Sequence, residues 1–390
     1  MPDSRNEPPH PSGAPAIPFL RPNLVRFEKY RAYLQGIDER RLYSNFGPLN
    51  SRFEARILEE YFGGRGAVST VNNATSGLML ALSLAKSPGR RYAVMPSFTF
   101  PATPLAAIWA GLEPLFVDVR GDDFCVGEAS LEEALRLHGD EVAAVVPYAA
   151  FGHPMDLAPY ARLVARGIPV VVDAAASFGA TRAGAAFASG FAGAVVYSFH
   201  ATKAFGIGEG GLVYSADAEL VARLREGANF GFGPDKICAS PGLNAKLPEV
   251  AAAIGLATLD EFPAKKRRRI EIYAWYRDEL ARHGLSSGGW AMQRQAGEVA
   301  HQFFPLLAPA GVSNVALQRS LAARGVEIRT YFRPPCHGQP AFERCARLAL
   351  PETDALAERV LSLPLWEEMT REQVATVVGG LAEARAAGTS

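Results

Sequence analysis

Short apolar runs recur along roughly the first two thirds of the chain and alternate with segments of helical period. Most of these runs are continuously apolar, which is typical of strands covered on both faces. Strands that alternate with helices favour a mostly parallel, doubly wound sheet. The pattern therefore predicts an α/β domain built on a seven-stranded sheet. Its strands are expected at 66–71, 92–97, 113–119, 142–148, 168–173, 192–198 and 211–215.

Two serines have the sequence context of helix starts. Ser130 is followed three residues later by Glu133, which is the spacing of a capping box, and predicts a helix that begins there. Ser313 predicts the start of a second helix, which Gly325 would close.

The pattern changes near residue 247. A helical stretch extends to about 283 and is interrupted by Pro248 and Pro263. It is followed by strand-like segments at 301–307 and 326–331 and by two C-terminal helices. We expect a disordered tail at 1–16, which is rich in proline and polar residues, a large α/β domain at 17–250 and a smaller α+β domain at 251–390.

Composition excludes several classes of function. Forty basic residues balance forty acidic ones, so there is no charge excess of the kind that nucleic acid or an anionic membrane attracts. No apolar run approaches the roughly 18 residues that cross a bilayer. The four cysteines are scattered without metal-ligand spacing, which predicts reduced thiols in a cytoplasmic protein and no metal site.

The strongest chemical signal is the segment from Ser198 to Lys203. It follows the apolar run at 192–197 and leads into a glycine-rich turn. Open α/β sheets bind ligands at the carboxyl ends of their strands, so Lys203 is expected to point into a cleft, where partial burial favours the neutral amine. A surface lysine in a loop is the alternative, and the preceding apolar strand argues against it.

Asp173 stands directly after Val170-Val171-Val172. Burying an ionised carboxylate is costly unless a partner offsets the charge, and a pyridinium N–H is a suitable partner. A lysine and an aspartate at the ends of buried strands are the two protein groups that a pyridoxal phosphate enzyme needs. The alternative is that Asp173 caps a helix that begins at Ala174.

A phosphate site is expected where the strand at 66–71 leads into a helix. Thr75 and Ser76 would add hydroxyl donors to the free N–H groups and the positive end of the helix dipole. Thr75 could instead be a simple N-cap. Ser198 would supply another hydroxyl from a neighbouring strand end. Phe100 could stack on a flat cofactor, although core packing is as good an account of Phe98 or Phe100 taken singly.

Taken together, these motifs resemble those of the DegT/StrS-type sugar-nucleotide aminotransferases, a fold-type I family that depends on pyridoxal phosphate. The resemblance covers nearly the whole chain from about Tyr43, and its most specific part is 198–211. The other matching segments are 44–49, 73–75, 96–100, 117–119, 173–175, 242–249 and 361–365.

The resemblance implies roles for these residues. Lys203 would carry the pyridoxal 5'-phosphate covalently and move a proton, Asp173 would pair with the ring nitrogen, and Phe100 would stack on the ring. Thr75, Ser76 and Ser198 would hold the phosphate. Asn244 or Lys246 would reach into the neighbouring subunit's site, which implies a homodimer with shared active sites. The expected substrates are L-glutamate and a nucleotide-linked keto sugar.

Two positions depart from the family pattern. Ala176 stands where Gln or His is common near the cofactor's phenolic oxygen, and Ala74 stands where glycine is usual. The segment 329–337, with Tyr331 and His337, resembles the substrate-side loop of a subgroup that acts on 4-keto-6-deoxy sugars. Two alternatives stay open. One is a pyridoxamine phosphate-dependent sugar dehydratase, against which Lys203 argues because those relatives carry histidine there. The other is a non-catalytic regulator on the same fold.

Overall fold

The computed structural model describes residues 16–386, and the tail expected at 1–16 lies outside this range except for Ala16. Seven main strands form the large sheet in the order β3-β2-β4-β5-β8-β9-β1, with a parallel bridge from Val145 to Val170 joining β4 to β5. The two-residue strand β13 pairs parallel with β3 at the edge of this sheet. All are parallel except β9, which runs antiparallel to both of its neighbours. The predicted mostly parallel, seven-stranded sheet is confirmed. Its strands are β1 (Ala67–Val71), β2 (Tyr92–Pro96), β3 (Glu113–Val117), β4 (Val142–Val145), β5 (Val171–Asp173), β8 (Ala194–Ser198) and β9 (Gly211–Ser215).

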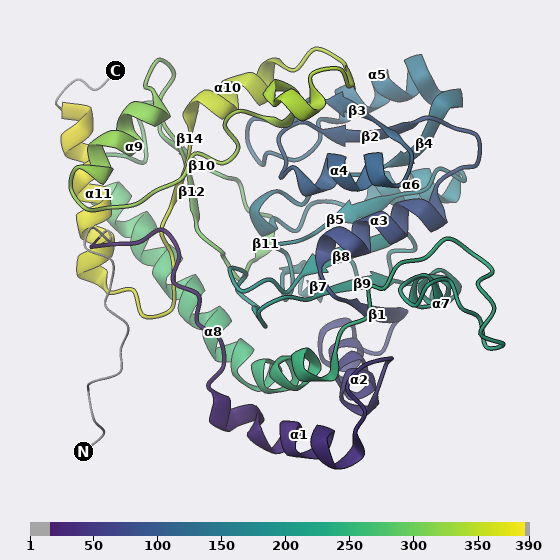
Figure 1. The fold of residues 1–390 in the computed structure, drawn as a ribbon. Helices are drawn as coiled ribbons and strands as arrows, with labels where there is room; N and C mark the ends of the chain where they lie inside the picture. Colours follow the sequence, from purple (N-terminus) through teal and green to yellow (C-terminus); the bar gives the residue numbers. More distant parts are fainter. Residues whose placement is uncertain (1–15, 387–390) are drawn as a thin grey trace, which may run out of the picture.

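Helices cover both faces of this sheet, which explains why its strands are continuously apolar (Figure 1). Within β8, for example, Val195 packs into the cluster on one face and Val196 into the cluster on the other. One face is covered by α3 (Ala74–Ala85), α4 (Ala102–Trp109) and α7 (Ala218–Gly227). The other is covered by α2 (Pro48–Phe62), α5 (Glu128–His138), α6 (Ala158–Ala165) and the first half of α8 (Glu249–Arg282).

The C-terminal part has its own core around a three-stranded antiparallel sheet. This sheet consists of β10 (Ala291–Met292), β12 (Phe304–Leu307) and β14 (Val360–Leu363), and α9 (Asn314–Ala322) and α11 (Arg371–Ala386) pack against it. The segment predicted as a strand at 326–331 is not one. It makes single bridges from Val326 to Ile17 and from Arg329 to Ser362. The remaining elements are α1 (Phe27–Arg40), α10 (Pro351–Arg359), β6 (Thr181–Arg182), β7 (Ala185–Ala186), β11 (Gly297–Glu298) and β13 (Ala346–Arg347).

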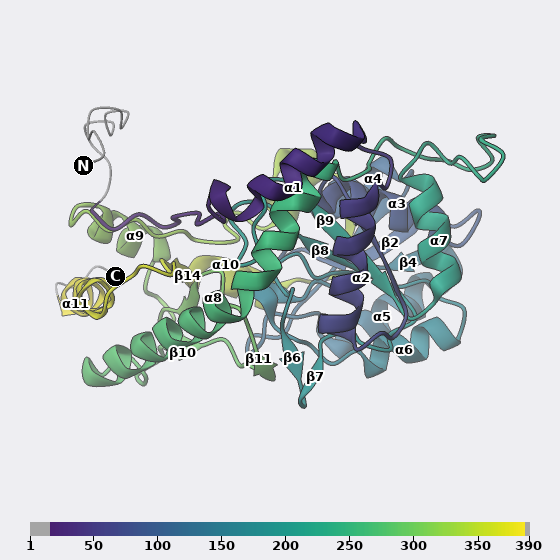
Figure 2. The same cartoon turned by 90° about the horizontal axis from the view of Figure 1, so that it is seen from below.

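The long helix α8 connects the two parts of the molecule (Figure 2). It begins directly after Pro248 and continues through Pro263 without ending, so the second proline does not divide the predicted helical stretch. The domain boundary expected at 250 falls at the start of this helix and stays a prediction. Within residues 16–386, no helix is at once long and apolar enough to span a bilayer.

Candidate active site

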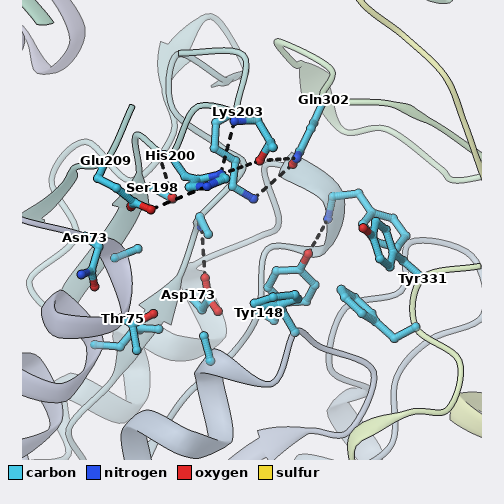
Figure 3. Close-up of a pocket in the computed structure, with 18 of the residues that line it drawn as sticks. Asn73, Thr75, Tyr148, Asp173, Ser198, His200, Lys203, Glu209, Gln302 and Tyr331 are labelled. Carbon is cyan, nitrogen blue, oxygen red and sulfur yellow. Dashed lines mark hydrogen bonds and ion pairs between the residues drawn. The ribbon is translucent and has the colours of Figure 1, made fainter. Parts of the chain in front are cut away.

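A cavity of about 670 Å³ lies where the C-terminal part meets the carboxyl ends of β4, β5 and β8. The sheet contributes Asp173 at the end of β5 and Ser198 at the end of β8. The C-terminal part contributes Gln302 and Tyr331 (Figure 3). This is the edge of the sheet at which the sequence places a ligand site. The predicted site residues that line the cavity are Thr75, Ser76, Phe100, Asp173, Ser198, Lys203 and Tyr331.

Asp173 is a buried carboxylate with donors on both oxygens. Its side chain is 3% exposed, Thr103 Oγ1 donates to Oδ2 at 2.6 Å, and the Ala175 N–H donates to Oδ1 at 3.1 Å. Burial raises the pKa of Asp173, while these two hydrogen bonds and the charge of Lys203 act in the opposite direction. No helix begins at Ala174, so the helix-cap interpretation of Asp173 is wrong. The carboxylate is instead held as an acceptor at the cavity wall.

Lys203 lines the same cavity and is partly shielded from solvent. Its Nζ donates a hydrogen bond to Gln302 Oε1 at 3.1 Å. Burial lowers the pKa of Lys203, and the Asp173 carboxylate counteracts this in part. A lowered pKa increases the fraction of the amine that is neutral, which is the form that attacks a carbonyl.

The phosphate end of the cavity is formed by the start of α3. Asn73 is the N-cap of this helix, because its Oδ1 accepts a hydrogen bond from the Ser76 N–H at 2.9 Å. The alternative of Thr75 as N-cap is therefore wrong. Thr75 and Ser76 lie in the first turn, where free N–H groups and the helix dipole favour an anion. Ser198 Oγ accepts from the His200 N–H at 3.3 Å, which leaves its own hydrogen available to an anion.

The two phenylalanines that follow β2, Phe98 and Phe100, have different environments. Phe98 is fully buried and packs edge-on against Phe124, Phe151 and Phe332. Phe100 lines the cavity and is 56% exposed. The core-packing interpretation therefore holds for Phe98 and fails for Phe100, which leaves the Phe100 ring face free for a flat ligand.

Three predicted residues are not brought into the cavity of their own chain. The Nδ1 atom of His337 forms a 2.7 Å hydrogen bond with Ser97 Oγ, and its Nε2 atom lies 3.1 Å from Asp354 Oδ1. Lys246 Nζ donates to Asn244 Oδ1 at 2.7 Å and lies over the ring of Phe230. A substrate contact by His337 therefore finds no support in the single chain. The partner-subunit roles of Asn244 and Lys246 stay predictions.

The sequence interpretation missed several cavity residues. Tyr148 follows β4 and bridges to Asp173, so its position at the end of a predicted strand was a usable signal. Thr103 and Gln302, which bond to Asp173 and Lys203, gave no such signal. Thr103 is the second residue of α4 and lies behind the cavity lining, and Gln302 lies inside a segment predicted as a strand.

A second cluster of ligand-type side chains lies away from the cavity. Asp123, Cys125 and His153 are all buried, with their ligand atoms within 4.8 Å of one another. Asp123 is already paired with Arg120 and Arg294, and burial raises the pKa of the Cys125 thiol to about 12. Two guanidinium groups and a neutral thiol are a poor environment for a metal ion, so this cluster is best explained as a buried ion-pair network.

The chemistry of the cavity fits pyridoxal 5'-phosphate. A helix N-terminus with hydroxyls from Thr75, Ser76 and Ser198 suits the phosphate. Within the described part of the chain, the oxygens of the buried Asp173 accept from Thr103 and Ala175 and from no cationic side chain, and a ring N–H would supply a cationic partner. Lys203 offers an amine of lowered pKa, and the exposed face of Phe100 suits stacking.

Comparison with solved structures defines the class of protein. A proposed PLP-dependent aminotransferase from Bacillus cereus ATCC 10987 has a TM-score of 0.92 and 46% sequence identity, covering 94% of this chain and 99% of that one. DesI, solved in the presence of its TDP-sugar product, has a TM-score of 0.85 and 32% identity, covering 97% and 96% of the two chains. The fold is that of the fold-type I pyridoxal phosphate-dependent aminotransferases.

The sequence comparison gives the family. The family model of the DegT/DnrJ/EryC1/StrS aminotransferases matches residues 27–382. The dTDP-4-amino-4,6-dideoxy-D-glucose transaminase of Escherichia coli is 26% identical over 371 residues, covering 93% of this chain and 96% of that relative. The chain belongs to the DegT/DnrJ/EryC1/StrS aminotransferase family, and it is an enzyme with pyridoxal 5'-phosphate as its cofactor.

Proposed function

We propose that this enzyme transfers an amino group from L-glutamate to the keto group of a nucleotide-linked 4-keto-6-deoxy sugar, in amino-sugar biosynthesis. The observation that carries the proposal is the presence of Lys203 and Asp173 on one cavity that also has a polar phosphate end and an apolar wall. The relatives add weight, because one is named for a dTDP-linked 4-amino-4,6-dideoxy sugar and another was solved with a TDP-sugar product. Four free cysteines fit a reducing, cytoplasmic location.

The overall reaction would convert L-glutamate to 2-oxoglutarate and the keto sugar to an amino sugar, in two half-reactions. When bound, the cofactor supplies an electron-accepting ring and carries the amino group between them. Thr75, Ser76 and Ser198 would hold its phosphate, and Asp173 would hold its ring nitrogen. Lys203 Nζ would take a proton from the α-carbon of glutamate and return one to the sugar carbon in the second half-reaction.

The walls of the cavity suit a deoxy sugar. Leu20, Phe151, Phe303 and Phe332 present apolar surface between the N-terminal segment and the C-terminal part. A methyl group packs against such surface without the cost of desolvating a hydroxyl. Leu20 lies before residue 27, where the family match begins, so this wall is partly built by a segment outside the matched region.

The proposed reaction is tested by supplying a panel of nucleotide-linked keto sugars with L-glutamate. We expect 2-oxoglutarate and an amino sugar in equal amounts, with 4-keto-6-deoxy substrates preferred. Excess L-glutamate alone should shift the absorbance of the bound cofactor. Loss of a sugar hydroxyl without nitrogen incorporation would indicate the dehydratase instead, and a protein that takes up no cofactor would indicate the regulator.

We further propose that the active unit is a homodimer with shared sites. Several apolar side chains of α4 and of the segment after α7 are exposed in the single chain, where a partner subunit would cover them. They are Leu105, Ile108, Trp109, Phe230, Phe232 and Ile237. Lys246 lies on this same segment and would act in the partner's site.

Intersubunit complementation tests this arrangement. Lys203→Ala and Lys246→Ala proteins are each expected to be nearly inactive or strongly impaired. After subunit exchange, half of the dimers carry one intact site, so about a quarter of wild-type activity should return if Lys246 serves the neighbouring site. If Lys246 acts within its own chain, or if the protein is monomeric by light scattering, no activity returns.

A further inference from the structure

The acceptor of the Lys203 amine comes from the other part of the molecule. Gln302 stands two residues before β12, whereas Lys203 follows β8 of the large sheet. Their side chains meet at the cavity wall, with Nζ 3.1 Å from Oε1 (Figure 3). The direction in which the lysine points therefore depends on how the C-terminal part is packed against the sheet.

The orientation of the Gln302 amide is fixed by a chain of hydrogen bonds on the loop that carries Lys203. The Thr202 N–H donates to His200 Nδ1 at 3.3 Å, so Nδ1 carries no hydrogen. The Thr202 hydroxyl, 2.8 Å from the same Nδ1, must then donate to it. Its oxygen is left as an acceptor for Gln302 Nε2, at a longer 3.5 Å.

This chain leaves only one orientation for the amide. With Nε2 directed at Thr202, the oxygen Oε1 faces Lys203 and can accept a hydrogen from Nζ in either protonation state. The other ring nitrogen, His200 Nε2, carries the hydrogen and lies 3.7 Å from Glu209. Hydrogen donation thus runs in one direction, from Lys203 through Gln302 and Thr202 to His200, whose Nε2 faces Glu209.

We propose that Gln302 is a positioning residue for the aminotransferase reaction, which holds Nζ of Lys203 at the cavity wall whenever the amine is not joined to the cofactor. With one N–H bonded to Oε1, rotation of the amine about the Cε–Nζ bond is restricted, and its lone pair takes one of the two remaining tetrahedral positions. Thr202 and His200 act through Gln302, because they determine which end of its amide faces the lysine.

Several charged or titratable groups surround Lys203 and contribute to its proton affinity. Those that line the same cavity are Tyr148 after β4, Asp173 at the end of β5, His200 and Glu209 on the lysine's own loop, and Tyr331 from the C-terminal part. Among the described residues, the charge contribution at Lys203 that opposes burial comes from Asp173. Gln302 is uncharged, so its replacement by glutamate adds a charge at a defined point without removing the acceptor.

The test uses Gln302→Leu, which removes the acceptor, and Gln302→Glu, which keeps it and adds a charge. The first readout uses cofactor-free protein: Lys203 is reductively methylated at a series of pH values, and the modified peptide is measured by mass spectrometry. We expect the pH midpoint of labelling to fall in Gln302→Leu and to rise by about 1–3 in Gln302→Glu, because an acceptor and a negative charge both favour the ammonium form.

The second readout is steady-state kinetics of the loaded enzyme. In Gln302→Leu we expect kcat to fall about 10-fold or more, with KM for L-glutamate nearly unchanged, because an oriented proton transfer is lost while substrate binding is kept. Gln302→Glu should retain more activity than Gln302→Leu and should shift its kcat profile to higher pH. Gln318→Leu is the matched control, because Gln318 also bonds a neighbouring group, the Ile328 carbonyl, but lies outside the cavity.

Three results would overturn the proposal. One is an unchanged labelling midpoint in both Gln302 variants, which would mean that the amide does not bond to the lysine in solution. Another is a Gln302→Leu protein whose kcat and pH profile match those of Gln318→Leu. A lower melting temperature shared by Gln302→Leu and Gln302→Glu, with equal loss of kcat, would show a purely structural role and also contradict it.

Discussion

Lys203→Ala is expected to reduce turnover almost to background and to abolish covalent attachment of the cofactor. A positioned proton-transfer group contributes about 10²–10⁴-fold to rate, and this residue is also expected to form the bond to the cofactor. The environment supports both tasks, because burial lowers the pKa of the Lys203 amine and Gln302 holds it at the cavity wall. The other amine-bearing residue singled out by the sequence, Lys246, does not line this cavity.

Borohydride trapping of the loaded protein, followed by peptide mass spectrometry, measures the attachment directly. We expect the label at position 203 in the wild type and no label in Lys203→Ala. Lys29→Ala is the control, because Lys29 is an exposed residue of α1 outside the cavity, and it should keep both label and activity. A label at any other position in the wild type would overturn the assignment of the site.

The sheet could be predicted almost completely because each of its strands is a short, continuously apolar run. All seven predicted runs contain a strand, and the segment at 211–215 matches β9 at both ends. The segment at 326–331 looked similar but failed. Its apolar residues pack into a core while its backbone pairs only at single positions, with Ile17 and with Ser362. Apolar patterning reports burial, and it does not report whether a neighbouring strand is available.

Helix caps illustrate the same limit at the level of single side chains. Ser313 caps α9 as predicted, with its Oγ accepting from the Ala316 N–H. Ser130 does not cap α5, which begins two residues earlier after Gly127. The Ser130 hydroxyl instead accepts a hydrogen bond from the Asp118 N–H at the end of the neighbouring strand. A serine hydroxyl can accept a hydrogen bond from a helix N–H or from another donor that the tertiary structure brings near. The sequence does not show which of these donors it will bond to.

The residues of the candidate site also fall into those that the sequence could predict and those that it could not. Asp173, Ser198 and Lys203 could be found because each follows a buried strand, and parallel strands bring their carboxyl ends to one edge of the sheet. Gln302 could not be found, because it reaches the cavity only through packing between two parts of the chain. The tertiary structure thus adds the groups that orient the chemistry, and the sequence supplies the groups that perform it.

Asp173→Asn is expected to lower kcat strongly without lowering the stability of the cofactor-free protein. Asparagine keeps the shape of the side chain and can keep its hydrogen bonds, because Oδ1 still accepts from the Ala175 N–H. Its Nδ2 can donate to Thr103 Oγ1, whose hydroxyl can turn to donate to Thr99 Oγ1, 3.0 Å away. The amide is neutral, however, and cannot hold a proton on the ring nitrogen of the cofactor, so we expect kcat to fall by about 10²–10³-fold, as for loss of one preorganised electrostatic partner.

The stability of the cofactor-free protein should change in the opposite direction. Burial raises the pKa of Asp173 above its value in the unfolded chain. A carboxyl group of this kind stabilises the fold while it is protonated, and that contribution is lost as the pH rises through the folded-state pKa. Above that pKa the cofactor-free wild type carries a buried charge that two hydrogen bonds and Lys203 offset only in part, and asparagine removes this charge. The melting temperature of cofactor-free Asp173→Asn should equal or exceed that of the wild type, and its advantage should shrink as the pH falls toward about 4.

Binding of pyridoxal phosphate should reverse this order, because the ring N–H offsets the charge of Asp173 only in the wild type. Thermal melts with and without cofactor, at several pH values, measure both effects in one experiment. The wild type should gain more from the cofactor than Asp173→Asn does. If asparagine instead lowers the melting temperature of the cofactor-free protein and leaves kcat intact, Asp173 is a structural residue that supports the turn after β5, and the ring nitrogen has no protein partner at this position.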